Sequence, residues 1–159
     1  MAETSVEALV ARLEKGRRKT RETLAGLAAD QWQTPIYPDP RWTARGLLAH
    51  FVSAEEQLLA LAQNVAAGGA GTPEGLDFDA FNAEEQARLA DQSPEALLAA
   101  LDAARQRTLN WVGTLGESQL DRVGRHPALG QVSVETMITA IYGHQLLHIR
   151  DLSEQVRRP

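Results

Sequence analysis

The sequence has 159 residues, no cysteine and a formal net charge of −5. That length is typical of one domain with a sizeable core, so we expect residues 1–159 to form a single helical domain. Without cysteine, disulfides, thiolate metal ligands and a cysteine nucleophile are all excluded. Acidic and basic residues are interspersed, whereas nucleic-acid binding usually needs a basic face, so we expect no nucleic-acid partner.

The sequence also gives expectations about its compartment and its fold class. No run of about 18 apolar residues occurs, so no membrane-spanning segment and no membrane partner is expected. The amino-terminal segment Met1–Glu7 is acidic and lacks the basic and then apolar pattern of a signal peptide, so we expect a cytoplasmic protein. Abundant alanine and leucine, with few aromatic residues, favour an all-α fold.

The first predicted helix begins near Thr4, because Thr4-Ser5-Val6-Glu7 has the form of a capping box. Its apolar stripe continues to about Ala29. A basic patch lies on the middle of this helix, formed by Lys15, Arg17, Arg18, Lys19 and Arg21. A solvated face is the favoured interpretation, and a binding rim for an acidic small molecule is the alternative.

A proline-rich loop is expected between residues 30 and 42, where prolines interrupt regular structure. These prolines are Pro35, Pro38 and Pro40. The loop also carries three aromatic side chains, which are Trp32, Tyr37 and Trp42. We expect these side chains to pin the loop to the bundle by packing.

Three further long helices are predicted. The second runs from about Thr43 to Ala67 and ends at the glycine-rich residues 68–71. Residues 68–93 form a long connection with a short helix around residues 80–90, and this length allows the third helix to run parallel to the second. The third helix starts at Ser93-Pro94 and reaches about residue 115, and the fourth begins near Ser133. The stretch 116–132 between them is predicted to be a loop.

Two histidines in the fourth predicted helix point to a metal site. His144 and His148 are four residues apart, so they lie on one helix face, one turn apart. A third histidine, His50, lies on the apolar stripe of the second helix. If these two helices are antiparallel, the three side chains differ in height along the bundle by only about 5 Å. We therefore predict a three-histidine metal site between the two helices.

Three imidazoles leave open positions on a bound ion, as catalytic or substrate-binding sites do, whereas structural zinc sites are closed by four ligands. Zinc and nickel suit imidazole best, and iron and manganese remain open. Asp151 follows His148 by nearly one turn on the same stripe. It either orients the His148 ring or is a simple carboxylate at the helix end. Both interpretations stay open.

Five other residues are considered. Glu55 and Glu56 lack the three- or four-residue spacing from His50 that would place them beside its ring, so neither is given a role. His126 precedes a proline in a predicted loop and is expected at the surface or at a pocket rim. Arg45 or Arg125 is a candidate to hold a substrate carboxylate at the mouth of the site.

Taken together, these segments resemble the DinB-like, or YfiT-like, metalloenzyme superfamily. The resemblance is carried by Trp42–His50, the Phe81-Asn82 turn, His144–Ile149 and the overall length, and it covers nearly the whole chain. It implies a four-helix bundle in up-down-down-up order, with a long crossover between the second and third helices. It also implies metal ligands at His50, His144 and His148, and a homodimer.

Members of that superfamily resemble thiol-dependent S-transferases, maleylpyruvate isomerases and hydrolases that disarm toxic metabolites. We therefore expect a divalent-metal-dependent enzyme that acts on a small molecule by thiol-dependent S-transfer or hydrolysis. The reacting group would be a metal-bound water or a low-molecular-weight thiol. The isomerase reaction is less favoured because no second domain is visible. The alternatives are a non-catalytic metal-binding stress-response or interaction protein, and a helical bundle with incidental histidines.

Overall fold

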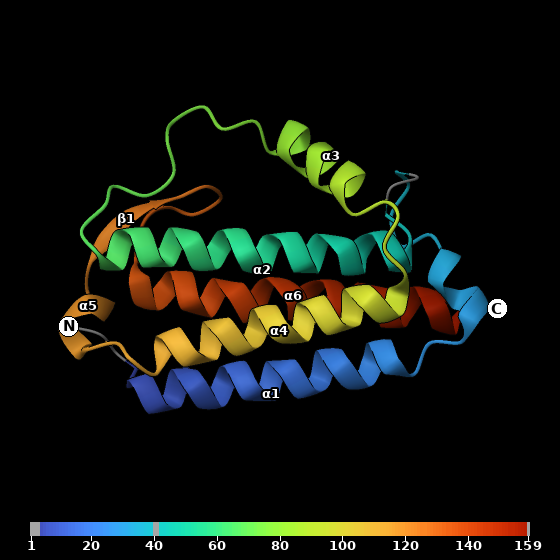
Figure 1. Cartoon of the computed structure of the whole chain (residues 1–159), viewed down its shortest axis with the longest axis horizontal. Helices are drawn as coiled ribbons and strands as arrows, with labels where there is room; N and C mark the ends of the chain where they lie inside the picture. The colour runs from blue at the N-terminus through green and yellow to red at the C-terminus, as the bar shows by residue number, and fades with distance from the viewer. Residues whose placement is uncertain (1–3, 40–41, 159) are drawn as a thin grey trace.

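The computed structural model describes residues 4–39 and 42–158 (Figure 1). Expectations that fall on Met1–Glu3 and Pro40 lie outside these residues. The elements in chain order are α1 (Val6–Ala25), η1 (Ala29–Gln33), α2 (Ala44–Ala66), α3 (Phe78–Arg88), α4 (Pro94–Val112), α5 (Glu117–Leu120), β1 (Val123–His126), β2 (Gly130–Ser133) and α6 (Val134–Arg157).

Four long helices form the bundle, and their directions follow the predicted order. Helix α2 runs antiparallel to α1, α4 runs parallel to α2, and α6 returns in the direction of α1 (Figure 1). Helices α1 and α2 each pack against both α4 and α6. The long connection between α2 and α4 crosses the outside of α2 and carries α3 (Figure 1). The four-helix bundle with an up-down-down-up order and a long crossover is therefore confirmed.

The long helices begin where their capping residues predict. The side-chain oxygens of Thr43, Ser93 and Ser133 each accept a hydrogen bond from the backbone N–H three residues on, which satisfies one orphan donor of the helix. Helix α1 is capped in the same way by Ser5 rather than by Thr4. It ends at Ala25, before the predicted end near Ala29, and residues 29–33 form the 3-10 helix η1 instead.

Residues 116–132 are not the plain loop that the sequence predicted. They contain the four-residue helix α5 and an antiparallel hairpin in which Val123 pairs with Ser133 and His126 pairs with Gly130. The turn closes at Gly130, whose φ of +73° favours glycine. Strands of four residues show too little alternation to be recognised by periodicity. Within the described residues, no helix is long and apolar enough to cross a membrane.

Two arginines tie the crossover to the bundle, and both were candidates to hold a substrate carboxylate. Arg45 donates to the backbone carbonyls of Leu89, Ala90 and Gln92, just after α3. Arg125 forms an ion pair with Glu74 at 2.7 Å. Both guanidinium groups therefore help to hold the long connection in place.

The core divides into two apolar clusters along the bundle axis. One includes Trp32 and Phe51, and the other includes Leu13 and Met137. Along α2, α4 and α6, the polar residues Glu55, Arg105 and Gln145 lie between the two clusters and are themselves buried. The bundle therefore carries a polar layer across its middle.

Candidate metal centre

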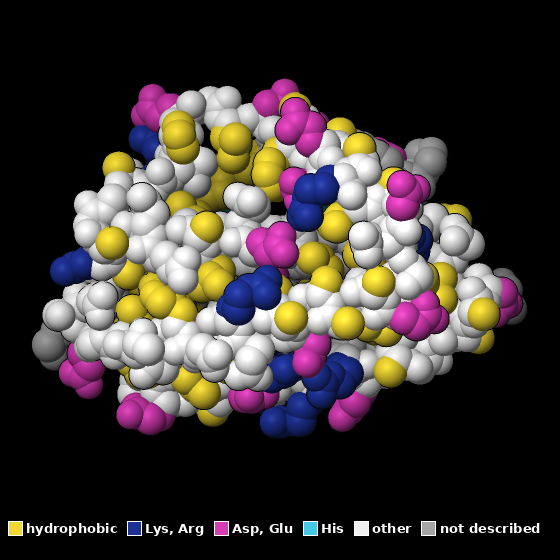
Figure 2. Space-filling model, in the orientation of Figure 1, with side chains coloured by type: hydrophobic (Ala, Val, Ile, Leu, Met, Phe, Trp, Pro, Cys, Tyr) yellow, Lys and Arg dark blue, Asp and Glu magenta, His cyan; other side chains and the backbone are white. Residues whose placement is uncertain are grey.

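Three histidine rings converge between α2 and α6. The Nε2 atom of His144 lies 3.0 Å from Nε2 of His50 and 3.2 Å from Nε2 of His148. One ligand atom from each ring falls within 4.8 Å of the other two. The face of the molecule shown in Figure 2, where α4 lies in front, displays no histidine among the described residues. The triad therefore does not reach that face of the bundle.

The convergence follows from helix geometry. His144 and His148 occupy successive turns of one α6 face, as their spacing predicts. Helix α2 runs antiparallel to α6 and packs against it, which brings His50 to the same height. The sequence could therefore place all three rings correctly once the directions of the two helices were known.

Tyr37 links His148 to Asp151, which the sequence had not foreseen. The Tyr37 hydroxyl donates to Asp151 Oδ2 at 2.6 Å and lies 2.6 Å from His148 Nδ1. Because the tyrosine proton goes to the carboxylate, the remaining contact is best made by an Nδ1–H of His148 donating to the hydroxyl oxygen. That tautomer leaves the Nε2 lone pair of His148 free to face the other two rings. Asp151 thus acts on the ring through Tyr37.

Aromatic side chains enclose the triad on two sides. The Trp42 ring meets the His50 ring edge to face, with centroids 5.0 Å apart. The buried Phe51 ring lies 6.4 Å from His144 and 6.1 Å from His148. Packing is thus the role of Trp42, as predicted, whereas Tyr37 adds a polar contact. The local loop is closed by a hydrogen bond from the Ile36 N–H to the Trp42 carbonyl.

Burial keeps the three imidazoles neutral. Desolvation, with smaller repulsion from the other two rings, lowers the pKa of His50 to about 3. Desolvation also lowers the pKa of His144 to about 4, with smaller contributions from His148 and His126. Burial lowers the pKa of His148 as well, although Asp151 opposes this effect. Neutral imidazoles are the form that binds a metal ion.

We expect the metal-free protein to lose stability as the pH falls below about 6.5. In the unfolded chain His50 and His144 take up protons near pH 6.5, whereas in the folded chain they do so only near 3 and 4. Protons thus favour the unfolded state in this interval, by up to about 1.4 kcal/mol per pH unit for each histidine. Urea denaturation in chelator at pH 7.5 and 5.5 checks this; equal unfolding free energies at the two values would contradict it.

The donor set fits a divalent ion. Zinc binds imidazole nitrogen at about 2.0–2.1 Å, which places two ligands of a tetrahedral ion about 3.3 Å apart. The Nε2 separations of 3.0 and 3.2 Å are close to that value. Without an ion, a neutral His144 has only one ring proton, so its Nε2 cannot donate to both neighbouring nitrogens. Three lone pairs aimed at one point are better satisfied by a cation.

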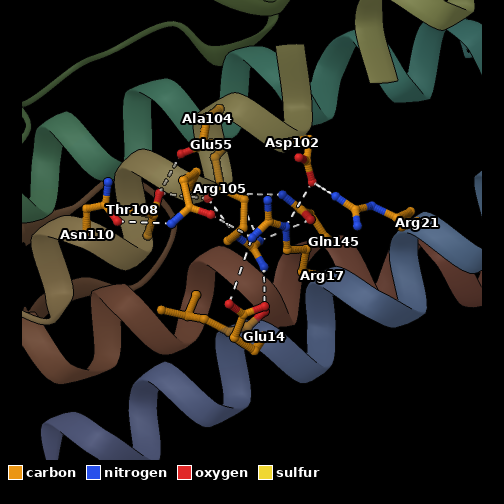
Figure 3. A network of polar contacts seen from close by, with 12 residues as sticks. Glu14, Arg17, Arg21, Glu55, Asp102, Ala104, Arg105, Thr108, Asn110 and Gln145 are labelled. Atoms are coloured by element: carbon orange, nitrogen blue, oxygen red, sulfur yellow. Dashed lines mark hydrogen bonds and ion pairs between the residues drawn. The ribbon is translucent and has the colours of Figure 1, made fainter. Parts of the chain in front are cut away.

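A buried polar network lies across the bundle and was missed from the sequence (Figure 3). Arg105 donates to both carboxylate oxygens of Glu55, at 2.7 and 2.9 Å, and to Gln145 Oε1. Thr108 and the Gln145 amide also donate to Glu55. Glu55, which was given no role, is therefore the centre of this network. It joins α2 to α4 and α6 close to His144, the residue before Gln145.

Two further expectations are revised by the structure. His126 is 6% exposed, so it is buried at the end of β1 and is not the surface or rim residue that was predicted. The basic patch on α1 is divided: Lys15, Arg18 and Lys19 are exposed, which matches a solvated face. In contrast, Arg17 and Arg21 both bind Asp102 of α4 and so join two helices of the bundle (Figure 3).

Solved structures share this fold at low sequence identity. YfiT from Bacillus subtilis, described as a probable metal-dependent hydrolase with an unusual four-helix bundle topology, aligns with a TM-score of 0.78 at 20% identity, covering 99% of this chain and 89% of that chain. A mycothiol-dependent maleylpyruvate isomerase aligns with a TM-score of 0.74 at 18% identity, covering 94% of this chain and 61% of that chain. A search of curated protein sequences finds no significant match.

A third structure corrects the expectation that nucleic acid is excluded as a partner. The colibactin self-resistance protein ClbS, solved in complex with double-stranded DNA, aligns with a TM-score of 0.77 at 14% identity, covering 100% of this chain and 99% of that chain. A protein of this fold therefore binds duplex DNA, so the fold does not exclude nucleic acid as a partner.

The sequence itself identifies the family. The profile of the DinB superfamily matches residues 12–152, which include all four long helices in whole or in large part and every histidine of the triad. The topology and the solved structures agree with that match. This chain belongs to the DinB superfamily.

Proposed function

We propose that His50, His144 and His148 hold one divalent metal ion, and that the chain is an enzyme acting on a small molecule by thiol-dependent S-transfer or hydrolysis. The observation that carries this proposal is the convergence of three Nε2 atoms on one point. A divalent ion held there would supply Lewis acidity and would lower the pKa of a water or thiol at its open positions. Zinc and nickel are the favoured ions.

The protein residues around the triad support this role. Tyr37 and Asp151 hold the His148 ring with Nε2 facing the site. Trp42 packs against the His50 ring, and Phe51 packs against the His144 ring. A Cβ added at Gly143, the residue before His144, would meet no heavy atom within 4 Å, so there is open space at this turn of α6.

The two candidate reactions, hydrolysis and thiol-dependent S-transfer, are suggested by the named relatives. YfiT is described as a probable metal-dependent hydrolase, and the isomerase is dependent on the thiol mycothiol. These descriptions favour a small-molecule substrate and a low-molecular-weight thiol as a cosubstrate. The alternative is a non-catalytic metal-binding stress-response or interaction protein, in which the ion stabilises the fold.

We also expect a single domain, a homodimer and a cytoplasmic location. Size-exclusion chromatography with light scattering tests the dimer.

The decisive experiment begins with protein purified without a histidine tag. Elemental analysis should give about one divalent ion per chain. The loaded and chelator-treated forms are then assayed with thiol cosubstrates and electrophiles, and with esters and amides. Turnover that needs the ion supports the enzyme, whereas a bound ion with no metal-dependent turnover favours the alternative. Absence of the ion, with no binding when zinc or nickel is added, contradicts both.

Replacing Tyr37 with phenylalanine should weaken metal binding by about 10-fold or more, because groups that orient ligand histidines typically contribute that much. The ring would still pack, but His148 Nδ1 and Asp151 would lose the hydroxyl that joins them. Asp151→Asn should have a similar effect. Competition with a chromophoric chelator measures the affinity.

The matched control for this prediction is Tyr142→Phe. Tyr142 packs on the α1 side of α6, against the backbone at Gly16, and should leave metal affinity unchanged. Equal losses in Tyr37→Phe and Tyr142→Phe, or no loss in either, would show that the hydroxyl does not orient His148.

A further inference from the structure

A buried hydrogen-bond donor on β1 has no partner among the described residues. His126 Nδ1 accepts hydrogen bonds from the backbone N–H groups of Ala128 and Leu129, at 3.1 and 3.2 Å. A nitrogen that accepts cannot carry the proton, and burial lowers the pKa of this ring, so the neutral ring carries its proton on Nε2. That Nε2 atom is fully buried and has no hydrogen-bond partner among the described residues.

Such a donor calls for an explanation, because nearly all buried polar atoms in native proteins are paired. The turn that follows His126 restricts rotation of its ring. The two residues after Pro127, Ala128 and Leu129, both donate to Nδ1. Rotating the ring to pair Nε2 elsewhere would break these two bonds. The donor is therefore fixed in position, with no hydrogen-bond partner among residues 4–39 and 42–158.

The backbone that carries His126 is held on both edges. On one edge His126 pairs with Gly130 of β2. On the other, Arg125 N–H donates to the Ala70 carbonyl, and Thr72 N–H donates to the Arg125 carbonyl. A Cβ added at Gly71 would lie 2.5 Å from the Arg125 carbonyl oxygen, so the connection at residues 70–72 and β1 are in close contact. A ring on so constrained a strand keeps its direction.

The strand face of His126 is turned toward the bundle. Gly124 lies on the same face of β1, two residues earlier, and a Cβ added there would lie 2.4 Å from Val65 Cγ2 of α2. Strand β1 contacts both α2 and α6, the helices that carry the triad. The ring also acts electrostatically on His144, since it contributes to the lowered pKa of that residue.

We propose that the His126 Nε2–H donates a hydrogen bond to a carboxylate oxygen of a small molecule whose other end binds at the triad. This inference rests on the proposed metal site. It makes His126 a specificity-determining residue and defines the substrate class as a molecule with a metal-binding group and a carboxylate separated by a short spacer. Leu147, which is 52% exposed on α6 next to His148, offers an apolar surface beside the triad for such a spacer.

A series of hydroxamic acids can measure this spacing in the zinc-loaded protein. Acetohydroxamate binds zinc through the hydroxamate alone and reports on the metal site. Monohydroxamates of malonic, succinic, glutaric and adipic acids add a carboxylate at increasing distance. At one chain length the carboxylate should raise affinity about 10-fold or more over the matching methyl ester, as a charge-assisted hydrogen bond does.

Two substitutions at His126 distinguish the role of its Nδ1 atom from the role of its Nε2 atom. His126→Asn keeps an acceptor near Nδ1 for the turn and removes the Nε2 donor, whereas His126→Gln places an amide donor near Nε2. His126→Asn should lose the carboxylate preference and keep the affinity for acetohydroxamate, and His126→Gln should retain part of the preference. The exposed Gln131→Ala on β2 is the control and should behave like the unaltered protein.

The outcomes are distinct. Failure of acetohydroxamate to bind would contradict the proposed metal site. Binding of acetohydroxamate with no preferred carboxylate length, or with a preference that survives in His126→Asn, would overturn the role of His126. If His126→Asn does not fold, the Nε2–H resonance of His126 in histidine-labelled protein replaces it as the test. That resonance should shift when the best hydroxamate binds and not with acetohydroxamate, and an unchanged resonance would overturn the inference.

Discussion

Replacing His144 with alanine should remove stoichiometric metal binding and the stability that the metal provides. His144 Nε2 is the nitrogen that faces both other rings, so its loss leaves two separated ligands. At free zinc about 1,000-fold above the dissociation constant, the intact protein should gain about 4 kcal/mol in its free energy of unfolding. That corresponds to a rise of about 10 °C in melting temperature, which the variant should lack.

Differential scanning calorimetry with and without zinc measures both effects. Glu154→Ala, which removes an exposed carboxylate from the same helix, should keep the ion and the rise in melting temperature. In chelator the His144→Ala protein should remain folded, because the imidazole Nδ1 that it removes is buried and has no hydrogen-bond partner in the part of the chain that the structure describes. A variant that binds one zinc per chain with unchanged affinity would show that the triad is not the metal site.

The second large effect is expected at Arg105, where Arg105→Met should destabilise the metal-free protein by about 3–5 kcal/mol. The guanidinium side chain is 2% exposed and its partner Glu55 is fully buried, so the substitution leaves a buried carboxylate without its counter-ion. Thr108 and Gln145 would still donate to Glu55, but neither carries a positive charge. Urea denaturation in chelator measures the loss.

A double-mutant cycle separates the pair from its surroundings. Glu55→Leu combined with Arg105→Met removes both charges and should be more stable than Arg105→Met alone, because no uncompensated charge remains. Arg88→Gln, which breaks an exposed ion pair with Glu85 and Glu56, is the control and should change stability by less than about 0.5 kcal/mol. Similar losses in Arg88→Gln and Arg105→Met would contradict a special role for the buried pair.

Local signals in the sequence were enough to predict the long helices and the triad. Thr43, Ser93 and Ser133 cap helices where their side chains predict, because capping depends on bonds within four residues. The spacing of His144 and His148 is likewise a local property of one helix. Only the placement of His50 beside the other two histidines required knowing that α2 and α6 run antiparallel. The length of the crossover supplied part of the information about helix directions.

The contacts that were missed join residues distant in sequence. Glu55 and Arg105 are 50 positions apart, and Glu55 lacks the spacing from His50 that would make it a ligand, so no local pattern pairs them. Tyr37 reaches His148 across 111 positions from a loop whose shape depends on its own backbone bonds. His126 appeared exposed because the hairpin around it is too short for periodicity to reveal. The expectation of no nucleic-acid partner is also wrong as an exclusion, since ClbS, which shares this fold, is solved in complex with duplex DNA.

The central claim is that three imidazole nitrogens share one cation. Anomalous diffraction, recorded above and below the zinc and nickel absorption edges on crystals of protein purified without a histidine tag, tests it most directly. The account predicts one strong peak about 2.0–2.2 Å from the Nε2 atoms of His50, His144 and His148. No peak at this position in metal-supplemented crystals, or rings turned apart with separate hydrogen-bond partners, would contradict it.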